Sequence, residues 1–193
     1  MYSYPIRTTA FVCLALLLFS LPFIAAAETV LRVGESVTLA ADQRVEDDFY
    51  AVGGSVALSG STAGDVYAVG GSITTNGSID ADFAALGGSV QVHAPVADDV
   101  RVVGGEVTIA DAVQGDVFVV AGSLNILASG SVQGDVFFYG GEAQIAGTVG
   151  GSVMGTAERF RIDAAVAGNV DVQSSRAVVI VDPACIGESV RYG

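Results

Sequence analysis

Apolar residues recur along the chain in short alternating clusters that return about every 17 residues. A clear copy is Asp65-Val66-Tyr67-Ala68-Val69-Gly70-Gly71, and an equivalent copy begins 17 residues earlier, at Asp48. Successive copies are separated by 17, 17, 17, 17, 19, 17 and 17 residues, with later starts at Asp82, Asp99, Asp116, Asp135, Ser152 and Asn169. A fixed short period is typical of stacked copies of one supersecondary unit.

Within each unit the apolar residues alternate, which is the period of a β-strand. One apolar column lies three residues before each start, another lies one residue after it, and two more lie eight and ten residues after it. In the unit of Asp48 these positions hold Val45, Phe49, Val56 and Leu58. Three short strands per unit predict an all-β chain, a single-stranded parallel β-helix with about nine rungs of roughly 17 residues.

Two partial units extend this pattern. Thr29 to Gly34 fits one unit upstream of Asp48 at a 19-residue step, and Ser189 to Tyr192 begins a last unit after Asn169. The Gly-Gly pairs predict corners at which the backbone adopts φ values that suit glycine. The 19-residue step after Asp116 predicts two additional residues in the corner at 127–131, where a longer turn leaves the columns in register.

Residues 1–27 differ in composition from the repeats. Arg7 precedes an apolar run from Phe11 to Ile24, and Ala25-Ala26-Ala27 offers a small-residue cleavage site, which predicts a secretory signal peptide. The alternative is an uncleaved membrane anchor over residues 8–27, which is nearly long enough to span a bilayer. Both interpretations place the β-helix domain, residues 28–193, outside the cytoplasm, in the periplasm, cell envelope or extracellular space.

The β-helix domain is strongly acidic. It carries all 21 acidic residues and seven of the eight basic residues, so its net charge is −14, and every basic residue is arginine. Such a charge disfavours nucleic acid as a partner, because phosphates need a basic surface. Cys185 is the only cysteine of this domain, so an internal disulfide is excluded, and Cys185 is expected either to lie in the last coil or to crosslink two chains.

Residue types that carry chemistry are scarce. The stacked starts form an acidic column, but the chain lacks the Gly-Gly-x-Gly-x-Asp calcium repeat, so turn-forming aspartates are favoured over a metal site: Asp48, Asp65, Asp82, Asp99, Asp116 and Asp135. His93 is the only histidine, and it is expected to face solvent near a corner without a nucleophile or carboxylate partner. The sequence therefore predicts no catalytic residue, cofactor, metal or small-molecule substrate.

The recurring Gly-Asp-Val-x-x-x-Gly-Gly motif resembles that of the bactofilins, the polymer-forming cytoskeletal proteins of bacteria. It occurs as Gly64-Asp65-Val66 with Gly70-Gly71, and as Gly134-Asp135-Val136 with Gly140-Gly141. The resemblance covers nearly all of residues 28–193 and implies a right-handed β-helix whose ends join into filaments without nucleotide. Bactofilins usually work on the cytoplasmic side of the membrane and carry flexible tails, whereas an export signal precedes the repeats here.

The ends of such a rod are candidate polymer contacts. An open β-helix end presents unpaired backbone groups, and no capping helix or charged plug is evident from the sequence. The residues expected at these contacts are Val30, Leu31, Val33, Val190 and Tyr192. The alternative is that the ends are protected by charged residues, namely Arg32, Glu35, Glu188 and Arg191.

A second candidate surface lies along the first strand of each rung. Residues next to the Phe49 and Val66 column are also apolar, and since strand side chains alternate, one of the two sets faces outward. The Phe49 column persists through more rungs and is placed inside, which leaves a lateral or partner face that includes Tyr50, Tyr67, Phe118, Phe137 and Tyr139. The opposite parity, or a cover formed by the N-terminal segment, stays open at this point.

Two functions compete on these grounds. The first is a non-enzymatic structural protein, a homopolymer of the cell envelope, with membrane or cell wall as a further contact. The second is a monomeric surface binding module or adhesin that binds glycan or protein through one face of the rod. An enzyme is disfavoured, because the turns are too short to build the cleft that catalytic β-helices need.

Overall fold

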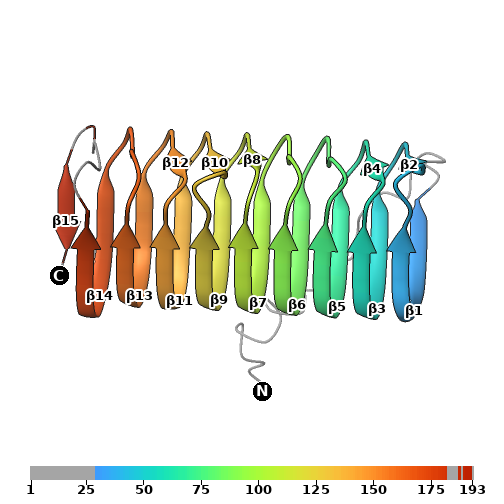
Figure 1. Cartoon of the computed structure of the whole chain (residues 1–193), viewed down its shortest axis with the longest axis horizontal. Coiled ribbons are helices and arrows are strands. Elements are labelled where there is room, and N and C mark those ends of the chain that lie inside the picture. The colour runs from blue at the N-terminus through green and yellow to red at the C-terminus, as the bar shows by residue number, and fades with distance from the viewer. Residues whose placement is uncertain (1–28, 182–186, 188, 193) are drawn as a thin grey trace, which may run out of the picture.

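The computed structural model describes residues 29–181, 187 and 189–192, and these residues form one long parallel β-solenoid (Figure 1). Ten strands are hydrogen-bonded in the order β1-β3-β5-β6-β7-β9-β11-β13-β14-β15, and all of their pairings are parallel. Nine of them each open one rung: β1 (Val30–Leu39), β3 (Phe49–Leu58), β5 (Val66–Thr75), β6 (Phe83–Val92), β7 (Val100–Ile109), β9 (Val117–Ile126), β11 (Val136–Ile145), β13 (Val153–Ile162) and β14 (Val170–Ile180). The predicted β-helix of about nine rungs is confirmed.

Each long strand covers two sides of a three-sided prism. In β3, Phe49 and Ala51 are buried before the Gly-Gly pair, whereas Val56 and Leu58 are buried after it. The inward positions change from odd to even numbers, so the strand bends at the glycines. The first two of the three strands expected per rung are therefore one ten-residue element.

The third side is much shorter. It consists of two-residue strands or of single bridges between rungs, such as Thr62 to Ile79. The two-residue strands are β2 (Arg44–Val45), β4 (Ser61–Thr62), β8 (Ala112–Val113), β10 (Ser131–Val132) and β12 (Thr148–Val149). A last strand, β15 (Val190–Tyr192), pairs with the first three residues of β14 and begins a further rung, as the sequence predicts.

The glycine corners do not need positive φ values, so that expectation was wrong. Among the described glycines only Gly155 has a positive φ, at 143°. At most rungs the corner glycines instead accommodate the close approach of successive rungs, although Ala121 and Ala157 occupy the same column. A Cβ added to Gly70 would lie 2.8 Å from the carbonyl oxygen of Gly53, and one added to Gly87 would lie 2.9 Å from that of Gly70.

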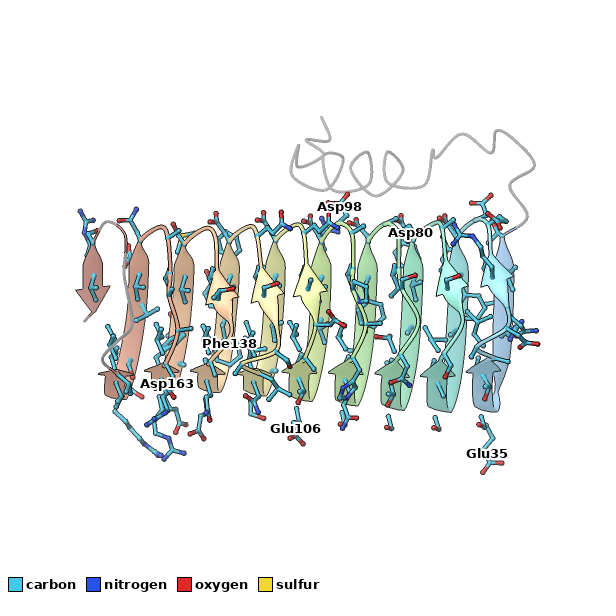
Figure 2. All side chains as sticks on the ribbon, turned by 45° about the horizontal axis from the view of Figure 1, so that its top comes forward. Glu35, Asp80, Asp98, Glu106, Phe138 and Asp163 are labelled. Atoms are coloured by element: carbon cyan, nitrogen blue, oxygen red, sulfur yellow. The ribbon has the colours of Figure 1, made fainter. Side chains whose placement is uncertain are left out.

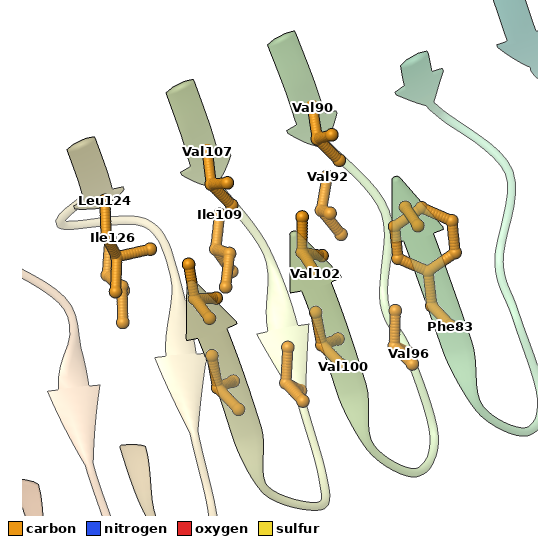
Figure 3. Packing of buried hydrophobic residues seen from close by; sticks show 14 of the residues in the cluster. Phe83, Val90, Val92, Val96, Val100, Val102, Val107, Ile109, Leu124 and Ile126 are labelled. Atoms are coloured by element: carbon orange, nitrogen blue, oxygen red, sulfur yellow. The ribbon is translucent and has the colours of Figure 1, made fainter. Parts of the chain in front are cut away.

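The interior is filled by stacked columns of side chains (Figure 3). The apolar columns identified in the sequence are buried over the described residues except at the two ends, where Val30, Val178 and Ile180 are only partly buried. Volumes compensate between neighbouring positions, since the large Phe49 and Phe83 are each followed two residues later by alanine. The largest departure is Phe138, which is fully buried in a column of smaller residues and has Gly155 opposite it in the next rung. A dense core tolerates a large ring only where a neighbour is small.

Longer turns account for the irregular steps. Between β9 and β10 four residues, 127–130, connect the strands, whereas two residues connect β3 to β4. The insertion predicted in the corner at 127–131 is therefore confirmed. The 19-residue step of the first rung has the same origin, a four-residue connection between β1 and β2.

Thr75 is the polar exception in an otherwise apolar column. It is 0% exposed, and its Oγ1 has no hydrogen-bond partner among the described residues. We expect Thr75→Val to raise the free energy of unfolding by about 1–2 kcal/mol, because it removes a buried unpaired hydroxyl. Denaturant unfolding of this variant and of Thr74→Val, a partly exposed neighbour, measures the effect. A loss of stability in Thr75→Val would contradict this account of the core.

Candidate interaction surfaces

The acidic column is a ladder of hydrogen bonds between rungs. Oδ1 of Asp48 accepts a hydrogen bond from the backbone N–H of Asp65, and the same contact recurs from each aspartate to the next rung. The ladder continues from Asp135 to Ser152 and from Ser152 to Asn169, with donor–acceptor distances between 2.7 and 3.1 Å throughout. Each start residue thus satisfies a corner amide of the following rung.

This ladder explains the Gly-Asp pair of the repeat. A Cβ at Gly115 would overlap Oδ1 of Asp99, and one at Gly134 would overlap Oδ1 of Asp116. At these two starts the preceding residue therefore has to leave room for the carboxylate of the rung before, whereas Ala81 and Asp98 hold this place before Asp82 and Asp99. The sequence predicted turn-forming aspartates, but the contact between rungs was missed, although the Gly-Asp pair that recurs at Asp65, Asp116 and Asp135 was a signal for it.

Asp116 offers a clean test of the ladder, because the structure records no ion pair for it. Asp116→Ala leaves the amide of Asp135 without its protein acceptor, and we expect it to lower the free energy of unfolding by about 1 kcal/mol. Asp116→Asn keeps an oxygen acceptor in place and should lie closer to the wild type. Equal losses of unfolding free energy in Asp116→Ala and Asp116→Asn would show that the aspartate column stabilises the protein through its charge and not through this hydrogen bond.

Arg101 neutralises the densest part of the column. Its Nη1 lies 2.6 Å from Oδ2 of Asp82 and its Nη2 lies 2.5 Å from Oδ2 of Asp99. The hydrogen bond with Asp82 raises the pKa of Arg101, so the guanidinium keeps its charge. Asp82, Asp98 and Asp99 have carboxylate oxygens within 4.8 Å of one another, and two of the three already contact this arginine.

An apolar strip runs along the outer side of the rod, between the acidic column and the glycine corner. The structure places the Phe49 column inside, so the neighbouring positions face outward, which is the parity that the sequence favoured. Ten of the twelve large apolar side chains exposed among the described residues lie here. We define the apolar strip as the apolar outward residues of the first seven rungs: Leu31, Val33, Tyr50, Val52, Tyr67, Val69, Ala84, Leu86, Val103, Phe118, Val120, Phe137 and Tyr139. The remaining outward position, in the fifth rung, is occupied by the charged Arg101.

The two halves of the apolar strip differ in shape. In the first four rungs, valines and Leu86 border a shallow trough whose floor is formed by the corner glycines. In rungs six and seven, aromatic rings project instead. Phe118 lies 6.4 Å from Phe137 and 6.2 Å from Tyr139, measured between ring centroids.

Tyr50 and Tyr67 stack at the acidic edge of the apolar strip. Their ring centroids are 4.8 Å apart with an interplanar angle of 12°, and the hydroxyl of Tyr67 donates a hydrogen bond to Oδ2 of Asp65 at 3.1 Å. Burial and then the hydrogen bond to Asp65 raise the pKa of Tyr67 to about 12, and burial also raises that of Tyr50.

These shifts predict that the protein loses stability in alkali. The folded chain holds the Tyr67 proton more tightly than the unfolded chain, whose tyrosines titrate near pH ~10. The stabilisation is therefore complete below about pH 10 and is lost as the pH rises through about 12. Ultraviolet titration of tyrosinate should show a late component that Tyr67→Phe removes. A titration near pH 10 for every tyrosine would contradict the prediction.

The first end of the rod carries a charged plug, Arg32, which was named from the sequence only in the alternative of ends protected by charged residues. Arg32 pairs with Ala51 in an inward column, and its guanidinium lies 5.5 Å from the ring centroid of Phe49. It donates hydrogen bonds to the carbonyl oxygen of Thr38 and to Oε1 of Gln43. The expectation that no plug is present was therefore wrong, and an inward-pointing charge protects this edge.

The predicted polymer contacts take different places at the two ends. Val30 lies in the Phe49 column, whereas the side chains of Leu31 and Val33 continue the apolar strip. They are 64% and 71% exposed. At the other end, Val190 and Tyr192 lie in β15, and Val190 is exposed. Past the three residues paired with β15, the outer edge of β14, which faces away from β13, has no partner strand among the described residues.

The remaining predictions concern isolated residues. His93 is exposed near a corner, as expected, and its Nε2 lies 3.4 Å from Oε1 of Gln91. Cys185, Glu188 and residues 1–27 lie outside the described residues. Within the described part of the chain, no helix is long and apolar enough to cross a membrane.

Comparisons with known proteins found no match for this chain. No protein-family model matches it, and no curated protein sequence and no solved structure does so either.

Proposed function

We propose that this chain is an exported structural protein of the cell envelope, whose solenoid joins end to end into nucleotide-independent filaments. The observation that carries the proposal is the pair of free edges of one parallel sheet. Among the described residues, β1 has no neighbour beyond it, and β14 is covered by β15 over only three residues. Joining the two edges would extend a sheet whose rungs already repeat. The bactofilin-like motif points in the same direction.

The backbone of β1 is suited to such a contact. The N–H of Val30 donates to the carbonyl oxygen of Asp48, so the backbone groups of Val30 face β3. Because successive residues of a strand turn their backbone groups to opposite sides, those of Leu31 and Val33 face the free edge. Exposed edges of this kind are templates for pairing with another chain.

Arg32 is the feature that opposes end-to-end joining. A neighbouring rod would press its own core against a guanidinium that now lies over Phe49. Removing a charge from water without a partner is costly, so assembly requires Arg32 to turn outward. Its long side chain permits this, since arginine can keep its stem on an apolar surface while its head reaches water.

Leu31→Pro tests the proposal at the free edge. Proline removes the outward N–H of residue 31 and leaves the pairing of β1 with β3 intact. We expect the wild type and Leu31→Ala to sediment as polymers, and Leu31→Pro to stay in the supernatant with an unchanged melting temperature. Equal sedimentation of all three would contradict assembly through this edge.

The exposed apolar strip favours a second candidate, a monomeric module that binds a surface partner. Single rods that remain monodisperse at every concentration, but that bind glycan or cell surfaces, would support this function. Filaments formed by the purified chain alone would argue against a monomeric binding module.

A further inference from the structure

We infer that the apolar strip is a lateral contact between two copies of this chain, which lie antiparallel with their strips face to face. The strip gathers most of the exposed large apolar side chains on one side of the rod. Contiguous apolar surface of this kind marks an interaction site in soluble proteins. The occupant is identified by the shape, the charge and the area of the strip.

The shape of the strip is self-complementary only in the antiparallel arrangement. A twofold axis across the fourth rung, at Leu86, places the seventh rung of one copy on the first rung of the other. Tyr139 then enters the trough beside Val33, and Phe118 meets the region of Tyr50. A twofold contact uses the same patch on both copies, so both ends of the strip are filled at once. A parallel arrangement would leave the two troughs facing each other, with no side chain to fill them.

The charges around the strip set the conditions for pairing. One long edge carries the aspartate ladder, and the other carries Glu106 and Glu142, the second of which pairs with Arg159. Figure 2 shows Glu35 and Glu106 on the side of the rod opposite to Asp80 and Asp98. In the antiparallel arrangement, the twofold axis leaves each column of side chains at the same lateral position in both copies. The two aspartate ladders therefore face each other across the contact. Packed sheets lie about 10 Å apart, and the screening length falls from ~10 Å at 0.1 M salt to ~3 Å at 1 M. Pairing should therefore strengthen as salt is added.

The area of the strip indicates a weak contact between single rods. Seven rungs at a spacing of about 4.8 Å give a strip ~29 Å long, and two side-chain columns make it ~10 Å wide. Two copies would bury only about 600 Å², below the ~1,200 Å² of a stable interface. When many such contacts form along two neighbouring filaments, they reinforce one another and hold the filaments together. Stable pairing thus rests on the end-to-end filaments proposed above, which align one strip after another.

Cysteine crosslinking in the full chain tests this contact. In a background with Cys13→Ser and Cys185→Ser, Leu86→Cys places two thiols next to the twofold axis. Gln91→Cys is the matched control, because residue 91 is exposed in the same rung but lies beyond the glycine corner. We expect oxidation to give a severalfold higher dimer fraction for Leu86→Cys, rising between ~0.1 and ~1 M salt. Equal dimer fractions for the two variants would overturn the proposal.

Two further variants report the orientation. Val69→Cys and Val103→Cys lie one rung on either side of Leu86, so a mixture of the two should crosslink to each other and neither to itself. Self-crosslinking of Val69→Cys would overturn the antiparallel arrangement. An intrachain disulfide between Leu86→Cys and a retained Cys13 would show that the N-terminal segment covers the strip, which would also overturn it.

Electron microscopy of the same samples separates this inference from the proposed function. Filaments without Leu86 crosslinks would reject the lateral contact and leave end-to-end assembly in place. Crosslinked pairs without filaments would reject end-to-end assembly and support the lateral contact.

Discussion

Phe138→Ala is expected to lower the free energy of unfolding by about 3–5 kcal/mol, the usual range for truncating a buried phenylalanine. Phe138 is 0% exposed, and its ring packs edge-on against that of Phe160, with centroids 6.0 Å apart and an interplanar angle of 89°. The backbone around it is stacked between two neighbouring rungs and can collapse little into the space left behind. Denaturant unfolding followed by circular dichroism measures the loss.

Phe137→Ala is the matched control for this substitution. Phe137 neighbours Phe138 in β11 but points outward into the apolar strip, where truncation should cost less than about 1 kcal/mol. A similar loss in the two variants would contradict the parity of the first strand, on which both the core and the strip depend.

Gly140→Ala is expected to destabilise the protein by about 2–3 kcal/mol, because the added methyl group has no space. A Cβ at residue 140 would overlap the carbonyl oxygen of Ala121 in the preceding rung. A carbonyl held in a ladder of hydrogen bonds cannot move aside without breaking the pairing of β9 with β11. Thermal unfolding of the variant should show a clearly lower midpoint.

Gly34→Ala is the control from the same column. Gly34 lies in the first rung, where the structure describes no preceding backbone, and an added Cβ would meet its nearest atom at 3.5 Å. We expect its stability to stay within about 0.5 kcal/mol of the wild type. If Gly34→Ala cost as much as Gly140→Ala, glycine would be required at this corner for its φ range and not for the spacing of the rungs.

The period and the alternation of the sequence were sufficient to predict the solenoid, its rungs and its interior columns. Each rung repeats the same few positions, so once Phe49 is assigned to the interior, the equivalent residue of every other rung is assigned as well. Contacts between rungs could not be obtained this way. The hydrogen bond that the backbone N–H of Asp65 donates to the Asp48 carboxylate depends on a side-chain rotamer that the spacing of residues does not specify.

The candidate surfaces were predicted less completely than the fold. Arg32 occupies an inward column at the first rung, and only the register of β1 against β3 shows that it lies over Phe49. The trough and the aromatic half of the apolar strip also depend on the stacked geometry of several rungs. The corner glycines were located correctly, but their physical reason was wrong, because the distance between rungs cannot be derived from one rung alone.

Negative-stain electron microscopy of the chain, purified from the expressing cells and kept free of nucleotide, tests the central proposal most directly. We predict filaments with an axial repeat of about 45 Å, the length of nine stacked rungs and the start of a tenth. At high salt these filaments should associate in pairs. Short rods of uniform length at every protein and salt concentration would contradict end-to-end assembly as the function of this protein.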